Sequence, residues 1–174
     1  MIYSERIICR LRHLLYTATS IKKAEYMQSV AQIHGTSIEE NNGIVKITFS
    51  SLMLKRKQWQ SSDLLIDPPY FALSDYTDRH MPQKFRECVV CFVNVYCRDL
   101  PSRRIRDYGN VELKQALDVI GVFLLEDDSG RLCDVYNTTE LGEADCTCIF
   151  IMRKDCFPEW LAKRQNQVQA ISDF

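Results

Sequence analysis

The sequence lacks the features that mark several large classes of protein. No apolar run approaches the roughly 18 residues that a membrane-spanning helix needs. The first twenty residues include Glu5, Arg6 and Arg10 and do not resemble a secretory signal. The formal net charge is only −1 at pH 7, which argues against a surface that coats nucleic acid everywhere but not against a local basic groove. We therefore expect a cytoplasmic protein with no membrane partner.

Repeats, low-complexity segments and zinc-binding patterns are also missing from the sequence. Eight cysteines are present, but Cys88 and Cys91 lie three residues apart in a strand-like segment and therefore point to opposite faces. Cys146 and Cys148 share a face, yet no second Cys or His pair stands nearby at zinc-finger spacing. Because reduced thiols pack as small apolar groups, we expect the cysteines mainly in the core.

What is present is typical of one globular domain. Of the 174 residues, 46% are hydrophobic, which is enough for a core and argues against disorder across the chain. Helices are predicted over residues 4–32, in a short segment opened by Pro68-Pro69, from an Asn110 cap to about Gly121, and over 157–171. Strands are predicted in a hairpin with an Asn42-Gly43 turn, in a central segment apolar on both faces (88–98), and over 132–137 and 146–152. This order predicts an α+β, or mixed α/β, fold.

Three aspartates occupy the bends where chemistry is most often placed. Asp107 follows the central strand, and Asp127 and Asp128 lie in a later turn. Carboxylates that converge can hold Mg²⁺ and activate water for phosphodiester hydrolysis. The neighbouring Arg103, Arg104 and Arg106 could hold a phosphate backbone. The alternative is structural, because Asp-Asp-Ser-Gly is common turn chemistry and mixed Arg/Asp segments are usually solvated.

These residues follow one another in a recognisable order. An arginine run leads to Asp107 and Asn110, then to Lys114, to Leu117-Asp118 and to Asp127-Asp128-Ser129. Residues 103–135 resemble the core of the RusA-type Holliday-junction resolvases, small phage and bacterial endodeoxyribonucleases. The similarity spans about residues 44–152, with 1–32 as an added helical extension and 153–174 as a C-terminal helix.

The resemblance implies a RusA-like mixed sheet flanked by helices, a homodimer, and cleavage of branched DNA with Mg²⁺ or Mn²⁺. It also implies a role for each matching side chain. The catalytic residues would be Asp107, Asp128 and Lys114, with Lys114 stabilising charge in the transition state. The metal ligands would be Asp107 and Asp128, with Asp127 as an auxiliary ligand. The DNA backbone would be tracked by Arg103, Arg104, Arg106, Lys55, Arg56 and Lys57.

Two departures from the family pattern keep a second hypothesis open. Gly109 stands where the family has another aspartate, and only Glu112 is placed to supply the missing oxygen. Lys114 lies one residue farther from Asn110 than the pattern expects, about 100° around a helix. The chain is thus either an endonuclease of a phage or mobile element, or a catalytically degenerate relative. Such a relative would bind DNA or inhibit a nucleic-acid-processing enzyme, as host-defence nuclease inhibitors of the anti-CRISPR kind do.

Simpler interpretations stand beside these assignments. Lys114 and Asp118 are four residues apart on a predicted helix, a spacing that more often marks an exposed ion pair than a catalytic pair. The Asp127-Asp128 turn is as compatible with a structural role as with a catalytic one. The basic run Lys55–Lys57 is equally compatible with a solvated loop and with a DNA contact.

Overall fold

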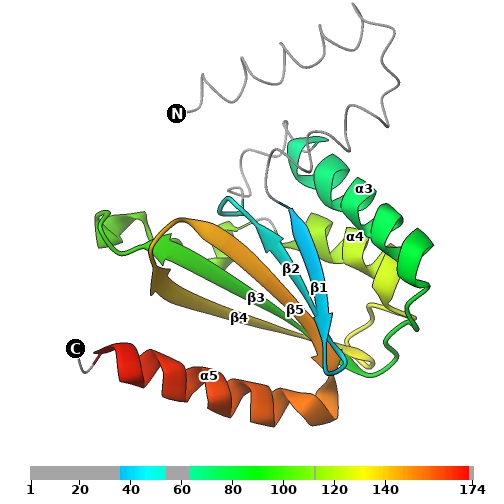
Figure 1. The fold of residues 1–174 in the computed structure, drawn as a ribbon. Helices are drawn as coiled ribbons and strands as arrows, with labels where there is room; N and C mark the ends of the chain where they lie inside the picture. The colour runs from blue at the N-terminus through cyan, green and yellow to red at the C-terminus, as the bar shows by residue number, and fades with distance from the viewer. Residues whose placement is uncertain (1–35, 54–62, 112, 173–174) are drawn as a thin grey trace, which may run out of the picture.

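The computed structural model of the protein describes residues 36–53, 63–111 and 113–172. Within these ranges, a five-stranded mixed sheet packs between helices on its two faces (Figure 1). The strands are β1 (Ser37–Asn41), β2 (Ile44–Phe49), β3 (Cys88–Cys97), β4 (Cys133–Gly142) and β5 (Cys146–Arg153), and the helices are α3 (Asp63–His80), α4 (Lys114–Leu124) and α5 (Phe157–Ser172). The predicted α+β class is confirmed. The helix predicted over residues 4–32 and the basic segment Leu54–Trp59 lie outside the described residues.

The order of strands across the sheet differs from their order in the sequence. It runs β1-β2-β5-β3-β4, so β5 inserts between the hairpin and β3. β3 and β4 are parallel, whereas the other neighbouring strands are antiparallel. The parallel pair is joined through α4, which carries the chain back along the sheet before β4 begins. The two connections of α4 therefore lie at opposite ends of the sheet.

The hairpin forms where the sequence predicts it. Asn42 and Gly43 have φ values of 51° and 73°, and both lie between the register partners Asn41 and Ile44. Positive φ at both central residues is what a tight two-residue hairpin turn requires, because its twist matches that of the strands. Asn and Gly tolerate this conformation at the least steric cost.

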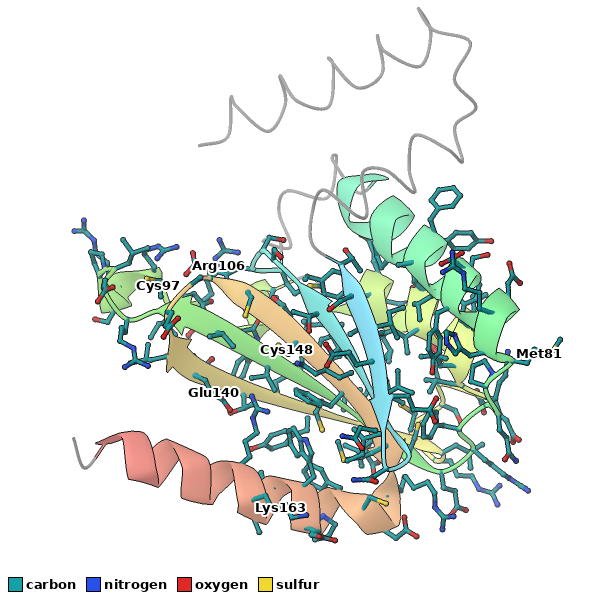
Figure 2. The ribbon with its side chains drawn as sticks, in the orientation of Figure 1. Met81, Cys97, Arg106, Glu140, Cys148 and Lys163 are labelled. Carbon is teal, nitrogen blue, oxygen red and sulfur yellow. The ribbon has the colours of Figure 1, made fainter. Side chains whose placement is uncertain are left out.

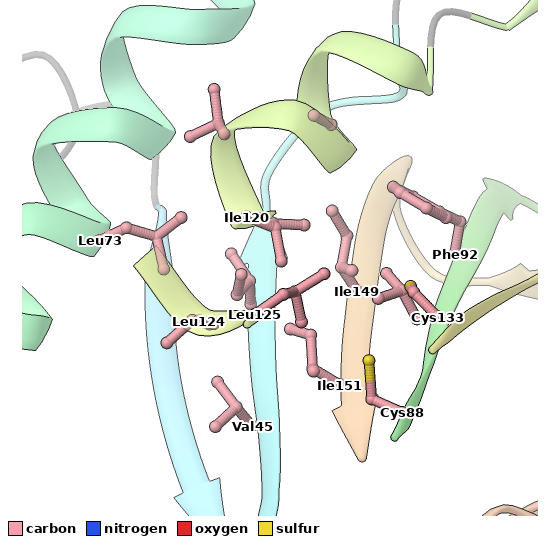
Figure 3. Close-up of a cluster of buried hydrophobic side chains, with 14 of the residues drawn as sticks. Val45, Leu73, Cys88, Phe92, Ile120, Leu124, Leu125, Cys133, Ile149 and Ile151 are labelled. Atoms are coloured by element: carbon pink, nitrogen blue, oxygen red, sulfur yellow. The ribbon is translucent and has the colours of Figure 1, made fainter. Parts of the chain in front are cut away.

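β3 supplies the centre of both hydrophobic cores. Its first seven residues are all buried, as the run of apolar residues on both faces predicts. Cys88 belongs to the core under α3 and α4, and Cys91 belongs to the opposite core under α5, so the prediction that they point to opposite faces is confirmed. Figure 3 shows the larger core, where Ile120 and Leu124 of α4 approach Ile149 and Ile151 of β5.

The helices begin at different residues from those predicted. α3 starts at Asp63, so Pro68 and Pro69 lie in its second turn, not its first, and two ladder N–H donors are lost there. α4 starts at Lys114 with Leu113 as its N-cap residue, while Asn110 ends a separate 3₁₀ turn. Gly121 does not interrupt α4, which continues to Leu124.

α3 and α4 cover one face of the sheet and α5 covers the other (Figure 1). Among the described residues, no helix combines the length and the apolar character that crossing a bilayer demands.

Candidate nucleic-acid interface

The segment that follows β3 carries the arginine run on two short turns. Residues 98–111, the arginine loop, contain 3₁₀ turns at Ser102–Arg104 and Tyr108–Asn110. The first is closed by the Ile105 N–H donating to the Ser102 carbonyl at 2.9 Å, and the second by the Val111 N–H donating to the Tyr108 carbonyl at 3.1 Å. The buried side chain of Val111 fixes the end of the loop in the core.

Arg104 holds the loop to the start of β5. Its guanidinium pairs with the Asp145 carboxylate, and the same carboxylate accepts the Cys97 N–H at 2.9 Å. Burial raises the pKa of Asp145, but the bonds from Cys97 and Arg104, together with the charges of Arg104 and Arg106, lower it further than burial raises it. Asp145 is therefore held ionised as the partner of this arginine.

Arg106 holds the loop to the segment after β2. Its Nη1 donates to the Met53 carbonyl at 2.7 Å, and its backbone N–H donates to the Tyr96 hydroxyl at 3.2 Å. The Met53 N–H in turn donates to the Thr147 hydroxyl at 3.2 Å. Arg106 thus joins three parts of the chain that are far apart in sequence, and Figure 2 shows it at the same end of the sheet as Cys97.

The remaining arginines of the loop point to solvent. Arg98 and Arg103 are both exposed, and no described residue pairs with either guanidinium. Exposed apolar side chains lie among them: Leu100, Ile105 and Tyr108 are 46%, 42% and 41% exposed. Arg103 belongs to the arginine run that the sequence singles out, whereas Arg98 lies outside that run, directly after the apolar strand β3.

Three buried amide atoms lie in the protein without a hydrogen-bond partner among the described residues: Asn94 Nδ2, Gln115 Oε1 and Asn137 Oδ1. Asn94 is 2% exposed and pairs in register with Thr139 on β4 and Thr147 on β5. It therefore lies toward the end of the sheet that carries the arginine loop. Gln115 belongs to the first turn of α4. Buried polar atoms of this kind normally bind ordered water.

Asp127 and Asp128 lie in the turn after α4. Both Asp127 oxygens accept hydrogen bonds from Ser129, at 3.1 Å from its N–H and 2.6 Å from its hydroxyl, and these bonds lower the pKa of Asp127. The Asp128 Cβ lies 3.8 Å from where a Cβ on Gly121 would stand, so this turn packs against α4. The Ser129 carbonyl accepts the Cys133 N–H at 2.9 Å, which places the turn at the start of β4.

Asp107 lies at the other end of the sheet. The hydroxyl of its neighbour Tyr108 lies 3.1 Å from the Thr139 hydroxyl, six residues along β4 from Cys133. Six strand residues span about 20 Å, whereas two oxygens on one Mg²⁺ are at most about 4 Å apart. A magnesium ion shared by Asp107 and Asp128 therefore does not fit the geometry of a single chain.

The other predicted site residues are distributed as follows. Lys114 Nζ donates to both Asp118 carboxylate oxygens, at 2.9 and 2.8 Å, as expected for an exposed helical ion pair. Glu112 and the basic run Lys55–Lys57 lie outside the described residues. Within the described ranges, no group of three or more His, Cys, Asp or Glu side chains is arranged to hold a metal ion.

A concavity of about 610 Å³ lies between α5 and the β1–β2 hairpin, away from the arginine loop. Each of its charged side chains has a partner: Lys46 with Glu39 at 3.6 Å, Lys163 with Glu159 at 2.7 Å, and Arg164 with Glu140 on β4. Because its charges are already neutralised in pairs, this groove is a weaker candidate for binding an ion than the arginine loop.

The chain belongs to a family described as "Family of unknown function (DUF6100)", whose match covers residues 1–174. No curated protein matches the chain.

Proposed function

We propose that this DUF6100 protein binds DNA through the arginine loop and does not cut it. One observation carries the proposal: Arg98 and Arg103 are exposed and unpaired by described residues, on a loop that two other arginines fasten to the sheet. A guanidinium without an internal partner is available for charge-assisted bonds to phosphate oxygens.

The fastening of the loop supports binding energetically. Arg104 and Arg106 are bound to Asp145 and to the Met53 carbonyl, so little backbone freedom remains to be lost when a ligand docks. Tyr108 offers a partly exposed ring beside the arginines. Aromatic rings next to basic side chains can stack on unpaired bases, which favours branched or otherwise structured DNA over a uniform duplex.

The resemblance to RusA-type resolvases supports DNA as the ligand, and the departures from that family support binding without cleavage. Gly109 contributes no carboxylate, and the remaining aspartates lie at two ends of β4. The proposal is therefore the catalytically degenerate form of the RusA-like hypothesis, with branched DNA as the preferred partner.

The test is a salt titration of binding to a labelled synthetic four-way junction, with a linear duplex for comparison. A plot of log K against log salt concentration has a negative slope, and removing one bond to a phosphate should make that slope shallower by about 0.9. For Arg98→Gln/Arg103→Gln we expect weaker binding and a slope shallower by roughly 1.8, if each side chain makes one phosphate bond. The matched control is Arg79→Gln/Arg86→Gln. It removes the same charge from the last turn of α3 and from the segment just before β3, at the end of β3 opposite the loop.

Equal weakening of binding in the two double variants would refute the arginine loop as the interface. No junction binding at low salt would refute the function and favour a protein partner instead. Cleavage of the junction with Mg²⁺ that disappears in Asp128→Asn would refute the claim that the protein does not cut.

A further inference from the structure

β4 forms one edge of the sheet that the described strands build. It pairs with β3 over ten residues without a bulge, and its other side pairs with no described strand. Val135 and Leu141 on this strand are 45% and 58% exposed. A long, regular edge with exposed apolar residues is a template for pairing with another strand.

The direction of each backbone group on β4 follows from its bonds to β3. The carbonyls of Leu132 and Gly142 accept the N–H groups of Cys88 and Arg98, both at 2.9 Å. Because backbone groups alternate sides along a strand, even-numbered residues of β4 direct their groups toward β3. Odd-numbered residues direct theirs outward: Val135, Asn137, Thr139 and Leu141 present four N–H and four C=O groups at the edge.

Among the described residues, the opposite edge of the sheet carries features that discourage pairing, whereas β4 does not. β1 has only five residues and carries Glu39 and Glu40, and short charged strands resist pairing. β4 contains neither Lys nor Pro. Its two acidic side chains are neutralised from within the chain, Asp134 by Lys154 at 2.9 Å and Glu140 by Arg164. Within the described part of the chain, the β4 edge is therefore uncovered, and its acidic side chains have partners.

We propose that a second copy of this chain pairs antiparallel with β4, with Thr138 on the two-fold axis. In this register Val135 lies opposite Leu141 of the partner subunit, and Asn137 lies opposite the partner's Thr139. Both exposed apolar side chains of the strand are covered, because the two-fold axis produces this Val135–Leu141 contact twice. All eight outward backbone groups of each copy gain a partner, as in an ordinary antiparallel ladder.

The charges of the strand agree with this register. Glu140 lies opposite the partner's Tyr136, and Asp134 lies opposite the partner's Gly142, so no like charges meet. Moving the axis to Asn137 would instead place Val135 opposite a threonine and leave Leu141 opposite the partner's Cys133. The self-complementary register selects a second copy as the occupant over an unrelated strand. The result is a ten-stranded sheet with an arginine loop at each end of the new seam.

The pairing does not depend on DNA binding, and its test uses the full chain without DNA. Sedimentation equilibrium of the wild-type protein should give twice the 20.3 kDa chain mass. Val135→Lys/Leu141→Lys places like charges opposite each other at two sites and should weaken the dimer at least a hundredfold. Val135→Lys/Leu141→Glu places Lys opposite Glu in the same register and should recover most of that affinity. Both side chains are exposed, so circular dichroism should show an unchanged fold in each variant.

A cysteine at the axis tests the register directly. Thr138 lies opposite its own copy in a non-hydrogen-bonded pair, where the Cα atoms are about 4.5 Å apart, within the range for a disulfide. Oxidised glutathione should therefore link Thr138→Cys into a covalent dimer: the two thiols lose two protons and two electrons, and the glutathione disulfide is reduced to two thiols. Thr139→Cys, opposite the partner's Asn137, and the wild-type protein should link far less.

A monomer at 100 µM would overturn the proposal. Equal association of the two double-charge variants would overturn it as well, and so would cross-linking of Thr138→Cys no greater than that of Thr139→Cys.

Discussion

Arg164 joins α5 to the sheet by two kinds of contact, and its replacement gives a sharp test of how that helix is held. The guanidinium makes a two-pronged pair with Glu140 on β4, with Nη2 to Oε2 at 2.7 Å, and both side chains are only about one-fifth exposed. It also lies 5.0 Å from the Phe150 ring centre and 5.2 Å from that of Trp160. The same side chain thus connects a carboxylate on β4, a ring on β5 and a ring on its own helix.

The expected cost of Arg164→Ala follows from these interactions. A charged hydrogen-bonded pair that is mostly buried contributes about 1.5–3 kcal/mol, since its removal leaves Glu140 without a partner. The cation–π interactions add about 0.5–1 kcal/mol. We therefore expect a decrease of about 2–4 kcal/mol in the free energy of unfolding. Arg164→Lys should show roughly half that decrease, because it keeps the charge but not the planar fork.

Urea unfolding followed by tryptophan fluorescence measures this decrease, at one fixed protein concentration because any association through β4 makes stability depend on concentration. The matched control is Arg153→Ala, which breaks an exposed pair with Asp155 at 2.5 Å and should change stability little. If Arg164→Ala costs no more than Arg153→Ala, α5 is held by its apolar face alone and the reasoning fails.

Two further predictions concern a helix interior and a buried phenol. Gly121→Ala should stabilise the protein by about 0.5–1 kcal/mol in urea unfolding, because the new methyl group meets only the Asp128 Cβ at 3.8 Å and alanine loses less backbone entropy than glycine; a decrease in stability would contradict the packing described. Burial and the hydrogen bond to Glu40 at 2.6 Å raise the pKa of Tyr76 to about 12, so its contribution to stability is complete below pH 10 and is lost as the pH rises toward 12. Tyr76→Phe should lower stability at neutral pH and should remove the latest step in an alkaline absorbance titration; an unchanged titration would show that this step belongs to another tyrosine.

Local features of the fold could be predicted from the sequence, because short-range physics decides them. The Asn42-Gly43 turn needs positive φ at both positions, and few other residue pairs accept it. Apolar residues on both faces of β3 required cover on both sides, and the structure provides it. The start of α4 was misplaced because Asn110 is an equally good residue for a short 3₁₀ turn, and nothing in the local pattern separates the two uses.

The predicted metal site required Asp107 and Asp128 to meet, and this depends on the relative direction of β3 and β4, which the local sequence does not determine. If β3 and β4 were antiparallel, the bends at Asp107 and Asp128 could meet at one end of the sheet. In a parallel pair joined by a crossover helix, the residues after the first strand and before the second lie at opposite ends. Arg104 and Arg106 were selected from sequence as contacts to a phosphate backbone, but in the structure their guanidinium groups bind Asp145 and the Met53 carbonyl, about 40 and 50 residues away, which the local pattern does not reveal.

The insertion of β5 between β2 and β3 has a consequence for how the chain folds during synthesis. Ile47 and its register partner Ile149 are separated by about one hundred residues, so the hairpin leaves the ribosome long before the strand that completes it. Until then the backbone groups on one side of β2 have no strand to pair with, and its apolar side chains are not covered. Assembly of the sheet must wait for the pairing of β2 with β5. Such topologies fold slowly, and their nascent chains are the kind that chaperones protect from aggregation.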